Sequence, residues 1–177
     1  MKELQVRKPN RLKGYDYSQR GLYFITICTK NRHEMFGEII AGQSILGEYG
    51  LAVKQEIEKI SKIRRECVIE KYVIMPNHLH MIVRIVSVGD DGNRPVEHLV
   101  DNANQRADCH PPLQRQQKSI SNMVQGLKGA ITRQIGFSLW QRSFHDHIIR
   151  TEQDYICISD YIDNNPSNWN TDCFYTK

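Results

Sequence analysis

Two histidines two residues apart lie inside a continuous apolar segment of the sequence. His78 and His80 belong to residues 72–83, which read YVIMPNHLHMIV. In a β-strand alternate residues share one face, so both imidazoles would project to one side while Leu79 would point into a core. Neutral imidazoles are common ligands of divalent metal ions, and two of them side by side suit such an ion. A purely structural histidine pair is the alternative that this pattern leaves open.

A tyrosine and an asparagine lie one helical turn apart near the C-terminal end. The pattern predicts a helix that begins after Thr151, a residue suited to capping, and ends before Pro166. Tyr161 and Asn165 would then present their side chains to one point. A phenol with a pKa of about 10 is a weak nucleophile, but a cation that polarises a phosphate makes its attack feasible. The alternatives are a tyrosine that belongs to the core and an asparagine that caps the helix.

The motif His78-Leu79-His80 resembles the His-hydrophobe-His motif of the HUH single-strand nucleases. Residues 140–150 (WQRSFHDHIIR), followed by DYI at 160–162 and NP at 165–166, are similar to the C-terminal signature of one branch. That branch is the REP-associated tyrosine transposases, which are relatives of the single-tyrosine insertion-sequence transposases. Residues 20–29 and 35–37 resemble the opening strand and turn of the same family, so the resemblance covers most of the chain.

The resemblance implies a specific reaction. Tyr161 matches the nucleophile, which attacks a single-stranded DNA phosphodiester and forms a 5′-phosphotyrosyl intermediate with a free 3′-hydroxyl. His78 and His80 match the metal ligands, and Asn165 matches the third ligand, which the helix carries. Mg²⁺ or Mn²⁺ is the implied ion, although two imidazoles alone would equally admit zinc. The implied partner is single-stranded or hairpin DNA formed by a palindromic repeat, bound by a monomer or a homodimer.

Composition limits the class of protein. The chain has 177 residues, of which 40% are hydrophobic, and this suits a single folded domain over residues 1–177. Its five cysteines show no Cys-x-x-Cys pairing, and no apolar run approaches the roughly 20 residues that span a bilayer. We therefore expect reduced thiols, a cytoplasmic location and no membrane partner.

The net charge is only +4, but the basic residues are clustered. Residues 1–33 hold eight Lys or Arg against two acids, and residues 113–150 hold six against one. Such clusters are candidate phosphate-binding surfaces, and a solvated basic face is the alternative. The residues that we predict to bind DNA are Arg11, Lys13, Arg20, Lys128, Arg133, His147 and Arg150.

Hydrophobic periodicity predicts the elements that position these residues. The expected strands cover residues 21–28, 67–75, 78–86 and 144–149, and the expected helices cover 49–65, 119–135 and 151–165. A basic arm over 1–19 precedes them, and a flexible insertion over 87–117 interrupts them. This order resembles an α+β ferredoxin-like sandwich, an antiparallel sheet with helices on one face.

Two other functions fit parts of the pattern. A protein that binds structured nucleic acid without cutting it would use the same basic segments and keep both histidines as structural residues. A binuclear metal hydrolase would continue the His-x-His motif with Asp and His, but the sequence has Ile82 and Val83 there. A second His-x-His pair, His145 and His147, lacks the apolar flanks of the first pair. The first pair is therefore the predicted metal site.

Overall fold

The main sheet has four antiparallel strands in the order β4-β5-β1-β6. We analysed a computed structural model, which describes residues 15–86 and 119–175. The strands are β1 (Gly21–Cys28), β4 (Cys67–Met75), β5 (His78–Ile85) and β6 (His145–Ile149). Their order with the intervening helices is that of a ferredoxin-like sandwich, so the predicted α+β class and antiparallel sheet are confirmed. The predicted insertion over 87–117, and Arg11 and Lys13 of the arm, lie outside the described residues.

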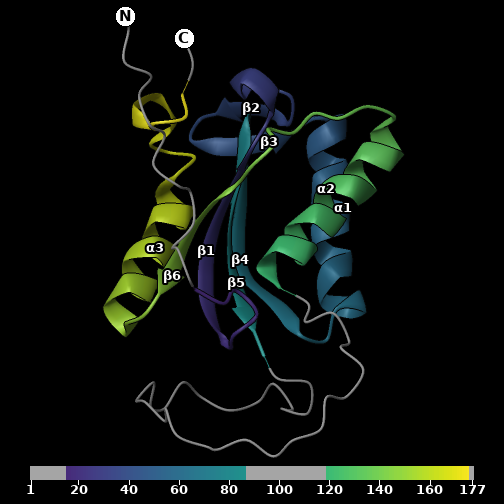
Figure 1. Cartoon of the computed structure of the whole chain (residues 1–177). Helices are drawn as coiled ribbons and strands as arrows, with labels where there is room; N and C mark the ends of the chain where they lie inside the picture. Colours follow the sequence, from purple (N-terminus) through teal and green to yellow (C-terminus); the bar gives the residue numbers. More distant parts are fainter. Residues whose placement is uncertain (1–14, 87–118, 176–177) are drawn as a thin grey trace, which may run out of the picture.

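The helices lie on both faces of this sheet (Figure 1). Helices α1 (Glu48–Ile63) and α2 (Ile120–Ile135) cover one face, and α3 (Glu152–Asn164) packs on the other. The expectation that all helices share one face is therefore wrong for α3. The cause lies in β5, which buries Leu79 and Met81 towards α1 and α2 but buries Ile82 towards α3. A strand that is apolar on both faces needs a covering layer on each side.

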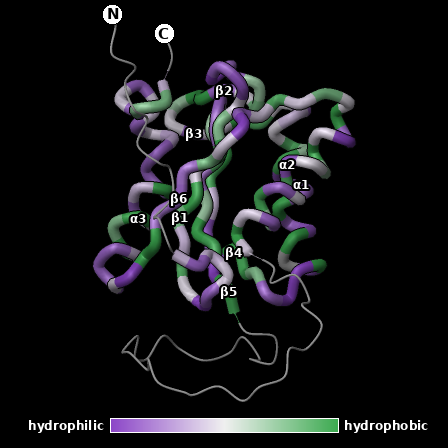
Figure 2. Tube along the Cα trace, viewed as in Figure 1, coloured by the Kyte–Doolittle hydropathy of each residue, from purple (hydrophilic) through white to green (hydrophobic). Residues whose placement is uncertain are grey.

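Each helix turns an apolar stripe towards the sheet and a polar side outwards (Figure 2). In α3 the predicted stripe of Tyr155, Ile158 and Ile162 packs against Ile82 and Ile149. Helix α2 begins after Ser119 and ends at Gly136, whose positive φ of 89° forms a left-handed cap. These ends agree with the predicted range to within one residue.

A second, two-stranded sheet was not predicted. Strands β2 (Gly37–Ile40) and β3 (Gln43–Leu46) form a hairpin between β1 and α1. The two-residue turn contains Ala41 and Gly42, both with positive φ, which is the geometry of a tight hairpin turn. An alanine in that position gives no turn signal in the sequence, and strands of four residues are too short for a clear alternation.

Two short 3₁₀ helices complete the described chain, η1 (Lys30–Arg32) after β1 and η2 (Trp169–Thr171) after α3. Among the described residues, no helix has the length and apolar composition needed to cross a membrane. The four described cysteines form no disulfide with one another. The segment after η2 returns towards the sheet, where it meets the two histidines of β5.

Candidate functional site

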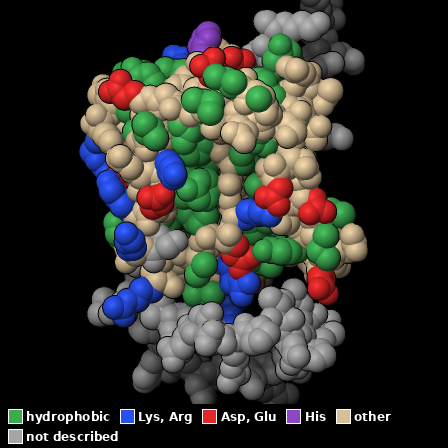
Figure 3. Space-filling model, turned by 180° about the vertical axis from the view of Figure 1, so that it is seen from behind, with side chains coloured by type: hydrophobic (Ala, Val, Ile, Leu, Met, Phe, Trp, Pro, Cys, Tyr) green, Lys and Arg blue, Asp and Glu red, His purple; other side chains and the backbone are tan. Residues whose placement is uncertain are grey.

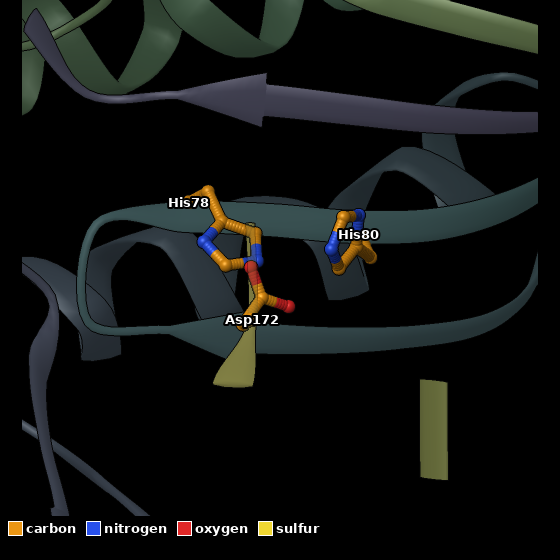
Figure 4. Close-up of side chains that lie close together, drawn as sticks. All are labelled: His78, His80 and Asp172. Atoms are coloured by element: carbon orange, nitrogen blue, oxygen red, sulfur yellow. The ribbon is translucent and has the colours of Figure 1, made fainter. Parts of the chain in front are cut away.

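The histidine pair lies at the start of β5, directly after the turn at Pro76 and Asn77. Both imidazoles point to the same side of the sheet, as predicted, and this is the side that α3 covers. Figure 4 shows them side by side on one strand. Their ring centroids are 4.4 Å apart. The side chains are almost fully buried, with exposed fractions of 0% for His78 and 1% for His80. Such burial requires that each ring nitrogen be accounted for.

Asn77 fixes the protonation of the His78 ring. Its side-chain amide donates to the backbone carbonyls of Arg32 and Phe174, at 3.2 and 2.8 Å. Its Oδ1 atom therefore faces the His78 Nδ1 atom, 2.8 Å away, and Nδ1 must carry the hydrogen. The Nε2 atom of His78 is left with a bare lone pair, and it is buried with no hydrogen-bond partner among the described residues. A buried lone pair held in this way suits a metal ion.

His80 has a comparable arrangement, with its partner on the neighbouring strand β1. Its Nδ1 atom lies 2.7 Å from the hydroxyl of Thr26, which β1 places directly opposite it. Its Nε2 atom lies 3.2 Å from the phenol oxygen of Tyr161. The ring is also stacked on Phe24, with centroids 5.1 Å apart. The outer nitrogen of His80 and the phenol of Tyr161 therefore meet at one point.

Helix α3 carries Tyr161 to this point. The helix begins where the Thr151 side chain accepts a hydrogen bond from the backbone N–H of Asp154, at 3.1 Å. Tyr161 lies beside the apolar stripe, and its hydroxyl donates to Asp172 at 3.0 Å. Burial, and then the negative charge of Asp172, raises the pKa of this phenol above its usual value. The phenol is therefore protonated at neutral pH and has a carboxylate as its proton acceptor.

Asp172 is a site residue that the sequence did not identify. Figure 4 shows its carboxylate next to the two histidines. The possible ligand atoms of the three residues all lie within 4.8 Å of one another. It follows η2 in a stretch without a motif, so only its place in the fold brings it here. Asn165, the predicted third ligand, ends α3 and donates its amide to Asp172 at 2.6 Å. The Oδ1 atom of Asn165 is buried without a hydrogen-bond partner among the described residues.

Aromatic side chains from the C-terminal segment cover the pair. The centroid of the Phe174 ring lies 4.7 Å from that of His78 and 5.7 Å from that of His80. The ring centroids of Trp169 and His78 are 5.9 Å apart. Arg32 holds this segment from the other side by donating to the carbonyl of Cys173 at 3.0 Å. Trp169 and Phe174 therefore cover the two histidines, while Tyr161 stays partly exposed.

Burial also sets the charge of the histidines. It lowers the pKa of His78 to about 4, although the nearby Asp172 acts in the opposite direction. Burial and the neighbouring His78 ring lower the pKa of His80 well below its usual value. Both imidazoles are therefore neutral at pH 7, which is the state that binds metal.

The donor set fits a divalent metal ion. Imidazole nitrogens of His78 and His80 converge with a carboxylate oxygen of Asp172, to which Asn165 donates its amide. The Nε2 atom of His78 and the Oδ1 atom of Asn165 are buried and unpartnered among the described residues. Mixed nitrogen and oxygen donors of this kind suit Mn²⁺ and zinc, and the oxygens also suit Mg²⁺. The residues that could hold a metal thus include both predicted histidines.

The predicted DNA-binding residues do not form one surface. Lys128 and Arg133 lie on α2, in the layer opposite the histidine pair. The ammonium group of Lys128 donates to the carbonyls of Gln141 and Ser143, and burial lowers its pKa to about 8. Seen from behind, Lys and Arg side chains line the margin on the side of α1 and α2 (Figure 3). Basic side chains are therefore not confined to the face of the histidine pair.

The other predicted DNA-binding residues flank β1 and β6. Arg20 precedes β1 and Arg150 follows β6, so both lie at the end of the sheet that is distant from the histidine pair. His147 is exposed on β6 and pairs with Phe24, which places it on the same face as the pair. Only His147 of this group lies on the site face close to the pair.

Comparisons with known proteins extend this description. No family model matches the chain. A solved structure of a REP-associated tyrosine transposase bound to a REP hairpin has the same fold, with a TM-score of 0.57 and 22% sequence identity. The match covers 90% of this chain and 74% of that chain. An uncharacterized protein of Haemophilus influenzae is 38% identical over 175 residues, which cover 96% of this chain and 93% of that protein. The chain belongs to the same family as this Haemophilus influenzae protein.

Proposed function

We propose that the protein is a metal-dependent tyrosine transposase that cuts and rejoins single-stranded DNA. The observation that carries the proposal is the convergence of the buried His78 Nε2 lone pair, the buried His80 ring and the partly exposed Tyr161 phenol. The resemblance of the sequence motifs to REP-associated tyrosine transposases and the shared fold support the same conclusion.

His78 and His80 would hold the metal through their Nε2 atoms, and an oxygen of Asn165 or Asp172 would complete the protein ligands. Mg²⁺ or Mn²⁺ is the proposed ion. When bound, such an ion supplies Lewis-acid polarisation of a phosphate oxygen. Asn77 and Thr26 orient the two rings through their Nδ1 atoms, which keeps the Nε2 atoms directed at the ligand position.

Tyr161 is the proposed nucleophile, and Asp172 is the group placed to take its proton. The phenol oxygen forms a bond to phosphorus while its hydrogen passes to the carboxylate that already accepts it at 3.0 Å. The bond from phosphorus to the 3′-oxygen breaks, and that oxygen leaves as a hydroxyl after taking a proton from water. Attack of a 3′-hydroxyl on the phosphotyrosine reverses these steps and rejoins a strand.

The proposed substrate is a DNA hairpin with single-stranded flanks, bound by a monomer or a homodimer. The neighbour of the same fold is bound to a REP hairpin. Because His78 and His80 are buried beneath Phe174, a phosphodiester reaches their Nε2 atoms only when that ring is displaced.

A covalent adduct tests this function. A labelled hairpin with single-stranded flanks, taken from DNA beside the encoding gene, is incubated with the protein and Mn²⁺ or Mg²⁺ and run on a denaturing gel. We expect a protein–DNA adduct that is lost in Tyr161→Phe and in His78→Ala, whereas Tyr155→Phe on the same helix retains it. An adduct that persists in Tyr161→Phe would remove Tyr161 as the nucleophile.

The cover over the histidine pair favours a second candidate function. A protein that binds structured nucleic acid without cleaving it has no need of an open metal site, and the histidine pair is covered by Phe174 and Trp169. Tight binding of the hairpin by the wild-type protein, with no adduct under any divalent ion, would establish this alternative.

A further inference from the structure

The second His-x-His pair of the sequence lies on the same face of the sheet as the first. In the described chain β6 is the last strand of the sheet and pairs only with β1. Residues that pair directly across neighbouring strands project to one face. His145 is paired with Thr26, which is paired in turn with His80, so these three residues form one row across the sheet. His147 lies two residues further along the same face.

This second pair differs from the first in its exposure and its contacts. His145 and His147 are both exposed, whereas His78 and His80 are buried. The Phe174 ring lies between the two sets, 5.7 Å from His80 and 6.4 Å from His145. The exposed imidazoles of His145 and His147 therefore lie next to the buried pair.

The acidic residue of β6 faces away from the two histidine pairs. The acidic residue of the strand, Asp146, is paired with Ile25 and faces the α1 and α2 side. The site face of β6 thus presents two hydrogen-bond donors without a carboxylate of its own. We refer to His145 and His147 as the β6 strip.

We propose that the β6 strip binds the backbone phosphates of the single strand next to the scissile phosphodiester, and this inference rests on the function proposed above. His145 binds the phosphate nearest to the histidine pair, and His147 binds the following one. Their side chains repeat along the strand at about 7 Å, and successive phosphates of an extended single strand have a similar separation. Imidazole N–H groups donate to phosphate oxygens, and such contacts position a strand without reading its sequence.

Phosphate-specific substitution tests the proposal. A hairpin with single-stranded flanks is synthesised with one methylphosphonate at a time, which removes the charge of one phosphate. Binding is measured by fluorescence anisotropy in the Tyr161→Phe background, where no cleavage disturbs the equilibrium. We expect one methylphosphonate beside the cleavage position to weaken binding by about tenfold, the range for a hydrogen bond to a charged group. The same substitution should have no further effect once His145→Ala is present.

His147→Ala should cancel the effect at the neighbouring phosphate in the same way. Lys54→Ala, an exposed cation on α1 in the opposite layer, is the matched control and should leave every methylphosphonate effect unchanged. Both histidines are exposed, so the variants should keep the wild-type melting temperature. The proposal would be overturned if every methylphosphonate weakened binding by the same factor with and without each histidine substitution. An absence of hairpin binding would overturn it as well.

The two proposals fail in distinguishable ways. Cancellation of the methylphosphonate effect by His145→Ala, with no adduct formed by the wild-type protein, would overturn the cleavage chemistry and leave the strip as a binding surface. An adduct that forms normally while the methylphosphonate effects stay additive would overturn the strip alone.

Discussion

Replacing Thr26 by valine tests whether the neighbour of His80 tunes the metal site. The change removes one hydroxyl at nearly constant shape from a buried position on β1. It deletes the 2.7 Å hydrogen bond to His80 Nδ1 and leaves that nitrogen without a partner inside the protein. A buried polar group left unpaired costs about 1–3 kcal/mol of stability, and loss of a group that orients a ligand lowers metal affinity by about 10- to 100-fold.

Thermal denaturation measures both effects. At a Mn²⁺ concentration about 100 times the dissociation constant, binding stabilises the wild-type protein by about 2.7 kcal/mol. A tenfold loss of affinity lowers this to about 1.4 kcal/mol at the same Mn²⁺ concentration, a difference of about 3–5 °C in the metal-induced shift of the melting temperature. Thr132→Val on α2 makes the same chemical change in the opposite layer and should preserve the full shift.

Equal Mn²⁺-induced shifts in Thr26→Val and in the wild-type protein would refute this reasoning. That result would mean that Thr26 does not orient the ring of His80, or that His80 does not bind the metal. Direct titration of His80→Ala by calorimetry separates the two cases, because only the second predicts wild-type affinity in that variant.

Three further outcomes follow from local contacts. Thr151→Ala removes the cap of α3 and should lower the free energy of unfolding by about 1 kcal/mol in a urea titration. Asp172→Ala should lower Mn²⁺ affinity by at least about tenfold in calorimetry, and unchanged affinity would exclude its carboxylate from the site. Burial raises the pKa of Cys28 to about 11, so iodoacetamide at pH 8 should label the exposed Cys157 in the native protein but Cys28 only after unfolding, as mass spectrometry would show.

Strands and helices with long periodic patterns could be predicted from the sequence. The expected range 21–28 agrees with β1, and the stripe of α2 was bounded by Ser119 and Gly136 because both caps have a strong chemical preference. The hairpin of β2 and β3 escaped prediction because four-residue strands carry too little periodicity. The position of α3 also escaped it, since an apolar run such as β5 does not show that both of its faces are covered by different helices.

The candidate site could be predicted only where its residues share one element. His78 and His80 are fixed by strand alternation, and Tyr161 and Asn165 by one helical turn. Asp172 approaches them because η2 reverses the chain after α3, and no local pattern encodes that approach. Clusters of basic residues in the sequence do not show which side chains already have partners in the fold. The ammonium group of Lys128, for example, donates to two backbone carbonyls.

The turn before β5 connects the fold to the chemistry of the site. The same two residues, Pro76 and Asn77, join β4 to β5 and so set the register that places His78 opposite Met75. The Asn77 amide then holds the carbonyl of Phe174, while its oxygen fixes the hydrogen on His78 Nδ1. Because one side chain makes both contacts, the position of the covering segment and the orientation of the His78 ring are coupled. A shift of the Phe174 backbone would therefore remove one of the two amide contacts that keep Asn77, and through it His78, in position.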